Sequence, residues 1–353
     1  MLTGIEISGK KIGPGHPCFV IAEAGVNHNG DPGLARRLVE AAAAAGADAV
    51  KFQTFCAERL VSRRAPKAKY QLEHTDRGES QFEMLRRLEL SIADHRALMD
   101  CCRANGVLFL STPFDEQSAD ALEALGIAAF KISSGEVTNL PFLAHVARKQ
   151  KPIILSTGMA TLAEVEGAIA FVSHEGNRDL VLLHCVTNYP ADPRDANLRA
   201  MHTMETAFGF PTGYSDHTPG IEVALAAVAL GACVIEKHFT LDRNMPGPDH
   251  QASIEPGELR AMVAGIRRVE AALGDGIKRP VEAEIPNISV ARKSLHWRRA
   301  LPAGTRVAAG DVIALRPDVG LPPEMVPAVV GQTLTRAVEA GQPVSHEEFQ
   351  RAP

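Results

Sequence analysis

Short apolar runs alternate with helical stretches along most of the chain, and this alternation restricts the fold more than any other feature. Eight runs rich in Val, Ile and Phe are predicted as strands: 18–25, 47–54, 107–113, 128–135, 152–158, 180–190, 212–217 and 232–239. Continuous apolar runs are typical of parallel strands that are covered on both faces. Eight such strand–helix units predict an α/β fold, a (β/α)8 TIM barrel. An open doubly wound sheet is the alternative.

Helix-end signals lie between the predicted strands. Asp31 and Pro32 suit an N-cap and a first helical position, and Gly46 suits the residue after the last turn. Thr161 and Glu164 have the spacing of a capping box. These signals support helices in the places where a barrel needs them.

The strand–helix alternation stops after residue 276. Residues 277–289 are charged and interrupted by Pro, which indicates a linker. Residues 290–353 are rich in Gly and Pro and contain short β-like pieces, with one short helix near 323–330. We therefore expect a catalytic barrel at 1–276, a linker at 277–289 and a small, mostly-β domain at 290–353.

The connection between the second and third strands, residues 56–90, is far longer than the usual two to six residues. Long ordered connections in compact domains are often lids over a binding site. Five basic residues lie in its first half: Arg59, Arg63, Arg64, Lys67 and Lys69. The sequence therefore predicts a basic lid.

Composition restricts the partners and the compartment. The chain has 353 residues and a net charge of −5, so it has no general attraction for nucleic acid or anionic membranes. No apolar run is long enough to span a bilayer, and the N-terminus lacks a signal-peptide core. Six cysteines without a CxxC pair indicate free thiols in a reducing compartment. We expect a cytoplasmic protein with small-molecule partners, no nucleic acid and no membrane.

Polar side chains follow every predicted strand, and the carboxyl ends of barrel strands are where active sites lie. Because side chains alternate along a strand, Lys51 shares a face with Gln53, and Glu236 shares one with His238. Any one of these residues could have a structural role. The convergence of polar side chains from eight strand ends favours a single functional site at the carboxyl end of the barrel.

The residue types at these strand ends indicate the chemistry. Lys51 and Lys131 with nearby Ser and Thr hydroxyls suit a ligand that carries both a phosphate and a carboxylate. His217 and His238 follow adjacent strands and could hold one divalent metal ion. Glutamates at two strand ends are candidates for proton transfer. A Walker loop, a GxGxxG fingerprint after a strand and an HExxH pair are absent from the sequence.

Seven segments resemble the sialic acid synthase family in order and spacing: "IAEAGVNHNGD", "AVKFQTF", "FKISSGEVTNLPFL", "ILSTGMAT", "LLHCVTNYPA", "GYSDHT" and "IEKHFTLDRNMPGPDH". The tail, "RVAAGDVIALRP" onward, resembles the antifreeze-like (SAF, β-clip) domain that ends these enzymes. The resemblance implies a nonulosonic acid synthase that condenses phosphoenolpyruvate with N-acetylmannosamine or a related N-acyl amino sugar, with C–O cleavage and release of phosphate. It also implies a cofactor, Mn²⁺ or another divalent ion, on His217 and His238.

The same resemblance implies a role for each matching residue. The residues around phosphoenolpyruvate would be Lys51, Thr112, Lys131, Ser134, Ser156, Asn188 and Tyr189. Gln53 and Asp249 would meet sugar hydroxyls, and Glu23 and Glu236 would handle protons or orient water. Arg316 would reach the N-acyl group in the partner's mouth of a domain-swapped homodimer.

Two positions depart from the family pattern. Relatives often have Ser or Asn two residues after the cysteine of the sixth strand, whereas this chain has Thr187, followed by Asn188. After Arg316 and Pro317 the chain has Asp318 in place of the usual Gly. Thr187 bears on the contact to the phosphate group, and Asp318 bears on the tail loop.

Three alternatives differ in class. A related phosphoenolpyruvate-dependent barrel synthase, such as one that makes 3-deoxy-octulosonate phosphate, is disfavoured by the tail. A Schiff-base aldolase would use Lys51 or Lys131 as nucleophile. A noncatalytic carbohydrate- or ice-binding protein is suggested by the tail alone, whose threonines are unevenly spaced. The amino sugar stays open among N-acetylmannosamine, the diacetamido-trideoxy hexoses of legionaminic or pseudaminic acid synthesis, and phosphorylated forms.

Overall fold

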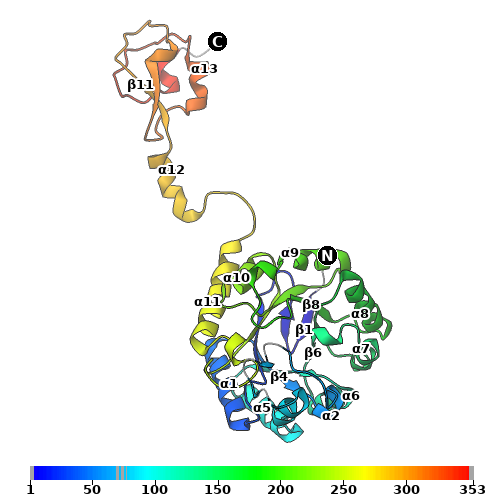
Figure 1. Ribbon diagram of the computed structural model, residues 1–353. Coiled ribbons are helices and arrows are strands. Elements are labelled where there is room, and N and C mark those ends of the chain that lie inside the picture. Colours follow the sequence, from blue (N-terminus) through cyan, green and yellow to red (C-terminus); the bar gives the residue numbers. More distant parts are fainter. Residues whose placement is uncertain (1–3, 69–70, 73–74, 77, 350–353) are drawn as a thin grey trace. The chain divides into compact units, whose positions relative to one another are not determined.

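The computed structural model describes residues 4–68, 71–72, 75–76 and 78–349. The chain divides between Gly274 and Asp275 into two compact units (Figure 1). The first unit is built from parallel strands and helices, and the second is a small unit with one antiparallel strand pair.

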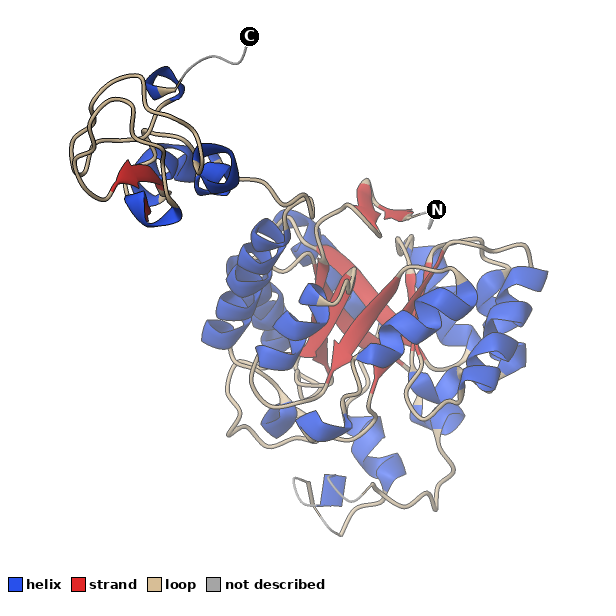
Figure 2. Ribbon diagram, turned by 90° about the horizontal axis from the view of Figure 1, so that it is seen from above, coloured by secondary structure: helices blue, strands red, loops and turns tan. Residues whose placement is uncertain are grey.

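Eight parallel strands form the sheet of the first unit. They are β3 (Phe19–Gly25), β4 (Ala49–Thr54), β5 (Leu108–Pro113), β6 (Phe130–Ile132), β7 (Ile153–Ser156), β8 (Leu180–Cys185), β9 (Thr212–Asp216) and β10 (Val234–His238). They pair in the order β5-β4-β3-β10-β9-β8-β7-β6. The two outer strands of that order, β5 and β6, lie against each other, so the sheet curls into a nearly closed barrel surrounded by helices (Figure 2). The predicted TIM-barrel fold is confirmed.

The surrounding helices are α1 (Pro32–Ala45), α5 (Ile92–Ala104), α6 (Glu116–Leu125), α7 (Leu140–Ala147), α8 (Leu162–His174), α9 (Arg199–Phe208), α10 (Glu222–Ala229) and α11 (Pro256–Leu273). The predicted end signals are confirmed. Asp31 accepts a hydrogen bond from the backbone N–H of Gly33, and Gly46 ends α1 with a φ of 87°. Thr161 and Glu164 form a complete capping box on α8.

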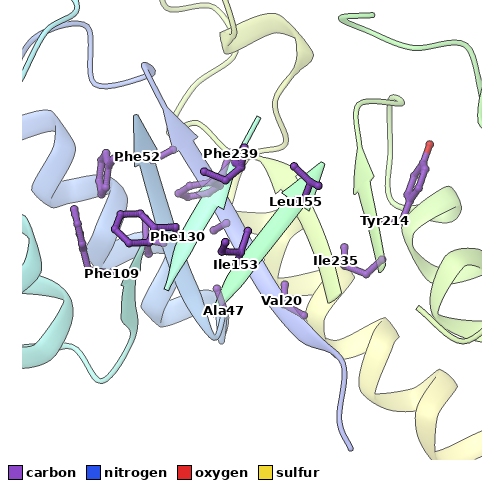
Figure 3. Close-up of a cluster of buried hydrophobic side chains, with 14 of the residues drawn as sticks. Val20, Ala47, Phe52, Phe109, Phe130, Ile153, Leu155, Tyr214, Ile235 and Phe239 are labelled. Atoms are coloured by element: carbon purple, nitrogen blue, oxygen red, sulfur yellow. The ribbon is translucent and has the colours of Figure 1, made fainter. Parts of the chain in front are cut away.

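Outward-facing strand residues pack against the helices and make the main core. Phe52, Phe130, Tyr214 and Ile235 are among its fully buried members (Figure 3). Because both faces of each strand are covered, the strands are apolar along most of their length.

A second core fills the amino-terminal half of the barrel interior. Phe19, Ile21 and Ile154 pack there with Ile7 and Ile12 of an N-terminal hairpin, formed by β1 (Ile5–Ile7) and β2 (Lys10–Ile12). The sequence analysis missed this hairpin, because three-residue strands are too short to show a periodic pattern. The hairpin closes one end of the barrel, so the cavity lies toward the other.

The second unit has a small core around Trp297, which donates a hydrogen bond of 3.0 Å from Nε1 to Glu348 Oε2. Its elements are β11 (Ser294–Trp297), β12 (Val312–Leu315) and α13 (Val326–Val329). Part of the predicted linker is helical, as α12 (Ile285–Ala291), because a proline in the first helical turn is tolerated.

The six cysteines are free thiols, as predicted. Within the described part of the chain, we find no helix that combines the length and the apolar character needed to cross a membrane.

Candidate active site

On β3 and β4 the interior face of the barrel changes from apolar to polar along the strand. On β3 and β4 the interior residues Ile21 and Ala49 belong to the inner core, and Glu23 and Lys51 come two residues later. The register places Lys51 beside Glu23, and Glu23 beside His238. Because these residues lie at the same level on neighbouring strands, their side chains meet at the carboxyl end of the barrel. The alternation of strand residues predicts this.

A cavity of about 320 Å³ opens at this mouth. Twelve predicted site residues line it: Glu23, Lys51, Gln53, Thr112, Lys131, Ser134, Ser156, Tyr189, His217, Glu236, His238 and Asp249. Asn188 is exposed and is not among the lining residues, whereas its neighbour Thr187 is. Arg316 belongs to the second unit, where its side chain is exposed.

Two glutamates and two lysines form a buried network inside the cavity. Lys51 Nζ lies 2.8 Å from Glu23 Oε2 and 3.8 Å from Glu236 Oε2. Lys131 Nζ lies 3.6 Å from Glu236 Oε1. Glu23 Oε2 contacts the Lys51 ammonium group, and Glu236 Oε2 is buried without a hydrogen-bond partner among the described residues. Both carboxylates can therefore still receive a proton or a hydrogen bond from a ligand.

The surroundings separate the pKa values of the two carboxyl groups. Burial raises the pKa of Glu23 to about 7, with Lys51 opposing the shift. Burial also acts on Glu236, but the ammonium groups of Lys131 and Lys51 outweigh it and hold the pKa of Glu236 below its ordinary value. Carboxyl groups separated in this way can take different roles, one exchanging protons near neutral pH and one staying ionised.

Hydroxyl groups surround the two ammonium groups. Lys51 Nζ donates to Thr112 Oγ1 at 3.0 Å, and Lys131 Nζ donates to Ser156 Oγ at 2.7 Å. Ser134 Oγ accepts a 2.9 Å hydrogen bond from the backbone N–H of Gly158. Two ammonium groups with several hydroxyl donors suit a small anion with more than one charged group.

Three aromatic rings form another part of the lining. The ring of Tyr189 lies 4.2 Å from that of His217 and 5.4 Å from that of His238, measured between centroids. His217 Nδ1 lies 2.6 Å from the carbonyl oxygen of Val186, which it meets as a donor, so Nε2 keeps its lone pair. Burial lowers the pKa of both histidines, so both are neutral at pH 7.

Asp249 is held in place by the loop that follows β3. Ser253 Oγ donates to the carbonyl oxygen of Asp249 at 2.6 Å and accepts from Asn27 Nδ2 at 2.9 Å. A second contact joins the loop after β3 to the segment after β10, where Asn29 Oδ1 lies 3.2 Å from His250 Nε2. Burial raises the pKa of Asp249 to about 6. The sequence analysis did not assign these roles, because they depend on contacts between distant loops.

The long connection after β4 contributes residues to the cavity lining, as expected of a lid, but none of its described cations does so. It contains α2 (Ala57–Leu60) and α4 (Gln81–Arg87), and none of Arg59, Arg63, Arg64 and Lys67 lines the cavity. Arg59 pairs with Asp115 at 2.8 Å, and buried Lys67 pairs with Glu79 at 3.0 Å. Lys69 lies outside the described residues. Lys67 therefore stabilises the lid from inside, because a buried ammonium group requires a partner.

Several lining residues were not assigned to the site from sequence, among them Cys185, Thr187 and Ser215. Ser215 donates to Glu236 Oε1 at 3.0 Å, and its position two residues before His217 was a usable signal. Thr187 Oγ1 is buried without a hydrogen-bond partner in the part of the chain that the structure describes. Thr187 follows its strand in a loop, where no period predicts side-chain direction.

Lys237 points away from the cavity. This is expected, because it lies between Glu236 and His238 on the strand and alternate side chains face opposite sides. Its ammonium group lies 2.7 Å from Asp216 Oδ2, and both side chains are fully buried. Asp216 Oδ1 also accepts hydrogen bonds from the backbone N–H and the hydroxyl of Thr218. The pair joins the two strands that carry His217 and His238.

Comparison with known proteins defines the class. The NeuB family model matches residues 38–278, and the SAF domain model matches residues 292–350. The chain belongs to the NeuB family, a family of nonulosonic acid synthases, and is an enzyme with a C-terminal SAF domain.

Two similar relatives are N,N'-diacetyllegionaminic acid synthases. The one from Legionella pneumophila is 48% identical over 99% of this chain and 98% of that protein. The one from Campylobacter jejuni is 49% identical over 90% of this chain and 96% of that protein. The crystal structure of N-acetylneuraminic acid synthetase from Leptospira borgpetersenii, in complex with citrate, matches with a TM-score of 0.72 and 36% identity over 82% of this chain and 96% of that chain.

Proposed function

We propose that the enzyme condenses phosphoenolpyruvate with an N-acyl amino sugar to give a nonulosonic acid and phosphate, which makes it a C–C bond-forming transferase. The observation that carries the proposal is the cavity itself. Two ammonium groups and several hydroxyls suit the phosphate and carboxylate of phosphoenolpyruvate, while two carboxyl groups with separated pKa values lie beside them.

The sugar we favour is a diacetamido-trideoxy hexose of the legionaminic type. The support is the similarity to two N,N'-diacetyllegionaminic acid synthases, each nearly half identical and matched over almost its whole length. N-acetylmannosamine is the main alternative.

The chain's own residues account for binding and proton transfer. Lys51, Lys131 and the hydroxyls of Thr112, Ser134 and Ser156 hold phosphoenolpyruvate so that its methylene carbon faces the sugar aldehyde. Tyr189 lies beside phosphoenolpyruvate, and Gln53 and Asp249 orient the sugar. The enol carbon attacks the aldehyde carbon, whose oxygen takes a proton from solvent and becomes a hydroxyl. Water adds to the resulting cationic C2, and the C2–O bond to phosphate then breaks, so that phosphate leaves with the proton of the new C2 hydroxyl and C2 becomes a ketone. Glu23 accepts a proton from that water, while ionised Glu236 stabilises the cation.

His217 and His238 fit a divalent metal ion such as Mn²⁺. Both rings are neutral and line the cavity, and His238 Nδ1 is buried with no hydrogen-bond partner among the residues described. Within the described residues, a three-ligand cluster is found at Cys56, Glu58 and Glu89, which do not line this cavity. When bound by the two histidines, the metal would polarise the sugar aldehyde as a Lewis acid. Chelation should abolish activity and Mn²⁺ should restore it.

Arg316 is proposed to act in trans, in a domain-swapped homodimer. Its exposed guanidinium can present a planar set of donors to the N-acyl carbonyl in the partner's cavity. The small core of the second unit supports docking onto a neighbour.

The test is a mass-spectrometric screen of phosphoenolpyruvate with candidate amino sugars. A nonulosonic acid and an equal amount of phosphate are expected with the diacetamido-trideoxy sugar. Trapping by borohydride of a covalent adduct with Lys131, whose pKa burial lowers, would instead support an aldolase. Absence of product with every sugar tested would contradict the proposal.

A further inference from the structure

Cys185 is the last residue of β8, and its side chain faces the cavity. Val181 and Leu183 on the same strand belong to the core inside the barrel. Because side chains alternate along a strand, Cys185 continues this inward-facing series and lines the cavity where the inner core ends. The thiol is buried and forms no disulfide. The proposed reaction gives this residue no role.

The thiol contacts the hydroxyl of Ser134. Cys185 Sγ lies 3.1 Å from Ser134 Oγ, and either atom can be the donor. Ser134 Oγ also accepts a hydrogen bond of 2.9 Å from the backbone N–H of Gly158. A serine hydroxyl has one proton to donate and two lone pairs that accept. Gly158 uses one lone pair, so the direction of the contact with the thiol decides where the Ser134 proton points.

An anionic ligand determines this direction. The charged oxygen atoms of phosphate and carboxylate groups only accept hydrogen bonds. Ser134 can therefore hold such a group only by donating its one proton to it. The contact with Cys185 must then run from the thiol to Ser134 Oγ. In this arrangement the hydroxyl accepts two hydrogen bonds, from Gly158 and from Cys185, and its proton is left for the ligand.

The backbone at Gly158 packs directly against these groups. A Cβ atom at residue 158 would lie 2.8 Å from Cys185 Sγ and 2.9 Å from Ser134 Oγ. It would also overlap the hydroxyl of Thr187. Contacts of a side-chain carbon are not this short, so the absence of a Cβ atom allows the N–H donor, the hydroxyl and the thiol to come together. The close packing leaves Ser134 little freedom to turn away.

We propose that Cys185 is a positioning residue for phosphoenolpyruvate, whose thiol donates to Ser134 Oγ and directs the Ser134 proton toward an anionic group of the ligand. The inference rests on the proposed function and adds to it a residue that acts through Ser134. Its effect falls on the binding of phosphoenolpyruvate and leaves the KM for the sugar unchanged.

The test compares Cys185→Ala with Cys185→Ser in the full-length enzyme. Titration calorimetry with phosphoenolpyruvate, in the absence of sugar, measures the Kd. Loss of one hydrogen bond to Ser134 should raise the Kd about 3-fold to 10-fold in Cys185→Ala. Cys185→Ser keeps a donor at this position, so its Kd should stay within about twofold of that of the unmodified enzyme. An unchanged Kd in Cys185→Ala, or equal increases in both variants, would overturn the inference.

A double-variant cycle shows whether Cys185 acts through Ser134. Ser134→Ala alone should raise the Kd, and Cys185→Ala added to it should cause no further increase, because the acceptor of the thiol proton is gone. An unchanged Kd in Ser134→Ala, or additive increases in the double variant, would contradict the positioning role.

Cys102→Ala is the matched control, because Cys102 is a buried cysteine on α5 that does not line the cavity. Its Kd for phosphoenolpyruvate should equal that of the unmodified enzyme. An increase like that in Cys185→Ala would show that loss of any buried thiol is enough, which would overturn the inference.

The outcomes separate the two proposals. If the variants give a contradicting result while the unmodified enzyme still joins phosphoenolpyruvate to an amino sugar, only the role of Cys185 is wrong. If the unmodified enzyme binds no phosphoenolpyruvate, the proposed function fails, and this inference fails with it.

Discussion

Glu23 and Glu236 are chemically identical side chains, yet their positions make them unequal. Glu23 contacts one ammonium group and is otherwise enclosed, so burial dominates and the pKa is raised to about 7. Glu236 lies within 4 Å of two ammonium groups and accepts from Ser215, so its carboxylate is stabilised. The division of labour in the proposed reaction follows from this difference.

The pH dependence of catalysis should report on Glu23. A proton acceptor must be ionised, and the carboxylate form of Glu23 becomes populated as pH rises through about 7. We therefore expect kcat/KM for phosphoenolpyruvate to rise through this range in the unmodified enzyme. Glu23→Gln should remove the rise and lower kcat about 10²- to 10⁴-fold.

Glu166→Gln is the control for this profile, because Glu166 is exposed on α8 and does not line the cavity. Its pH profile should match that of the unmodified enzyme. Persistence of the rise near pH 7 in Glu23→Gln would assign the ionisation to another group.

Some residue assignments could be predicted from sequence, and the reason is the period of a strand. Glu236 and His238 alternate with Lys237, so their opposite directions follow once the segment is recognised as a strand. The separation of the Glu23 and Glu236 pKa values could not be predicted, because it depends on which strand ends are neighbours in space. The same holds for the lid cations, whose partners Asp115 and Glu79 are set by tertiary packing.

At the scale of elements, β9 and β10 carry both imidazoles and are joined by a buried ion pair on their outer faces. Lys237 lies directly opposite Asp216 in the strand register. The pair fixes the two strands against each other one residue away from His217 and His238.

Breaking this pair should destabilise the barrel. Lys237→Met leaves Asp216 buried without its counter-charge, which costs about 3–5 kcal/mol in the free energy of unfolding. The double variant Asp216→Asn with Lys237→Met removes both charges and should recover part of the loss. Denaturant titration of the single and double variants measures the coupling, and strictly additive losses would show that the pair contributes nothing.

The elements themselves were predictable to different degrees. The eight strands carry enough buried Val, Ile and Phe to be recognised, and caps such as Thr161 and Glu164 mark helix starts. The N-terminal hairpin was not recognised, since Ile7 and Ile12 show their role only through packing inside the barrel. Helix α12 was hidden by Pro286, which is compatible with a first turn and was interpreted as a break.

At the scale of the whole molecule, the chain combines a barrel with a small C-terminal unit, and the proposed swapped homodimer gives that unit a role. Complementation tests it. Lys131→Ala should inactivate the barrel cavity and Arg316→Ala the tail, each abolishing activity in its own homodimer. Co-expression should restore roughly a quarter of the activity, because about half of the dimers are mixed and each has one intact site.

Mixed dimers that form and yet stay inactive would show that each tail serves its own barrel. Native mass spectrometry of the co-expressed chains is the control, because it shows directly whether mixed dimers have formed.

The central claim is that the cavity joins phosphoenolpyruvate to an amino sugar with cleavage of the C2–O bond. Phosphoenolpyruvate labelled with ¹⁸O at the bridging oxygen distinguishes this route from hydrolysis at phosphorus. With the diacetamido-trideoxy sugar, the account predicts phosphate that retains the label and a nonulosonic acid that lacks it, both measured by mass spectrometry. Label in the nonulosonic acid together with unlabelled phosphate would contradict it.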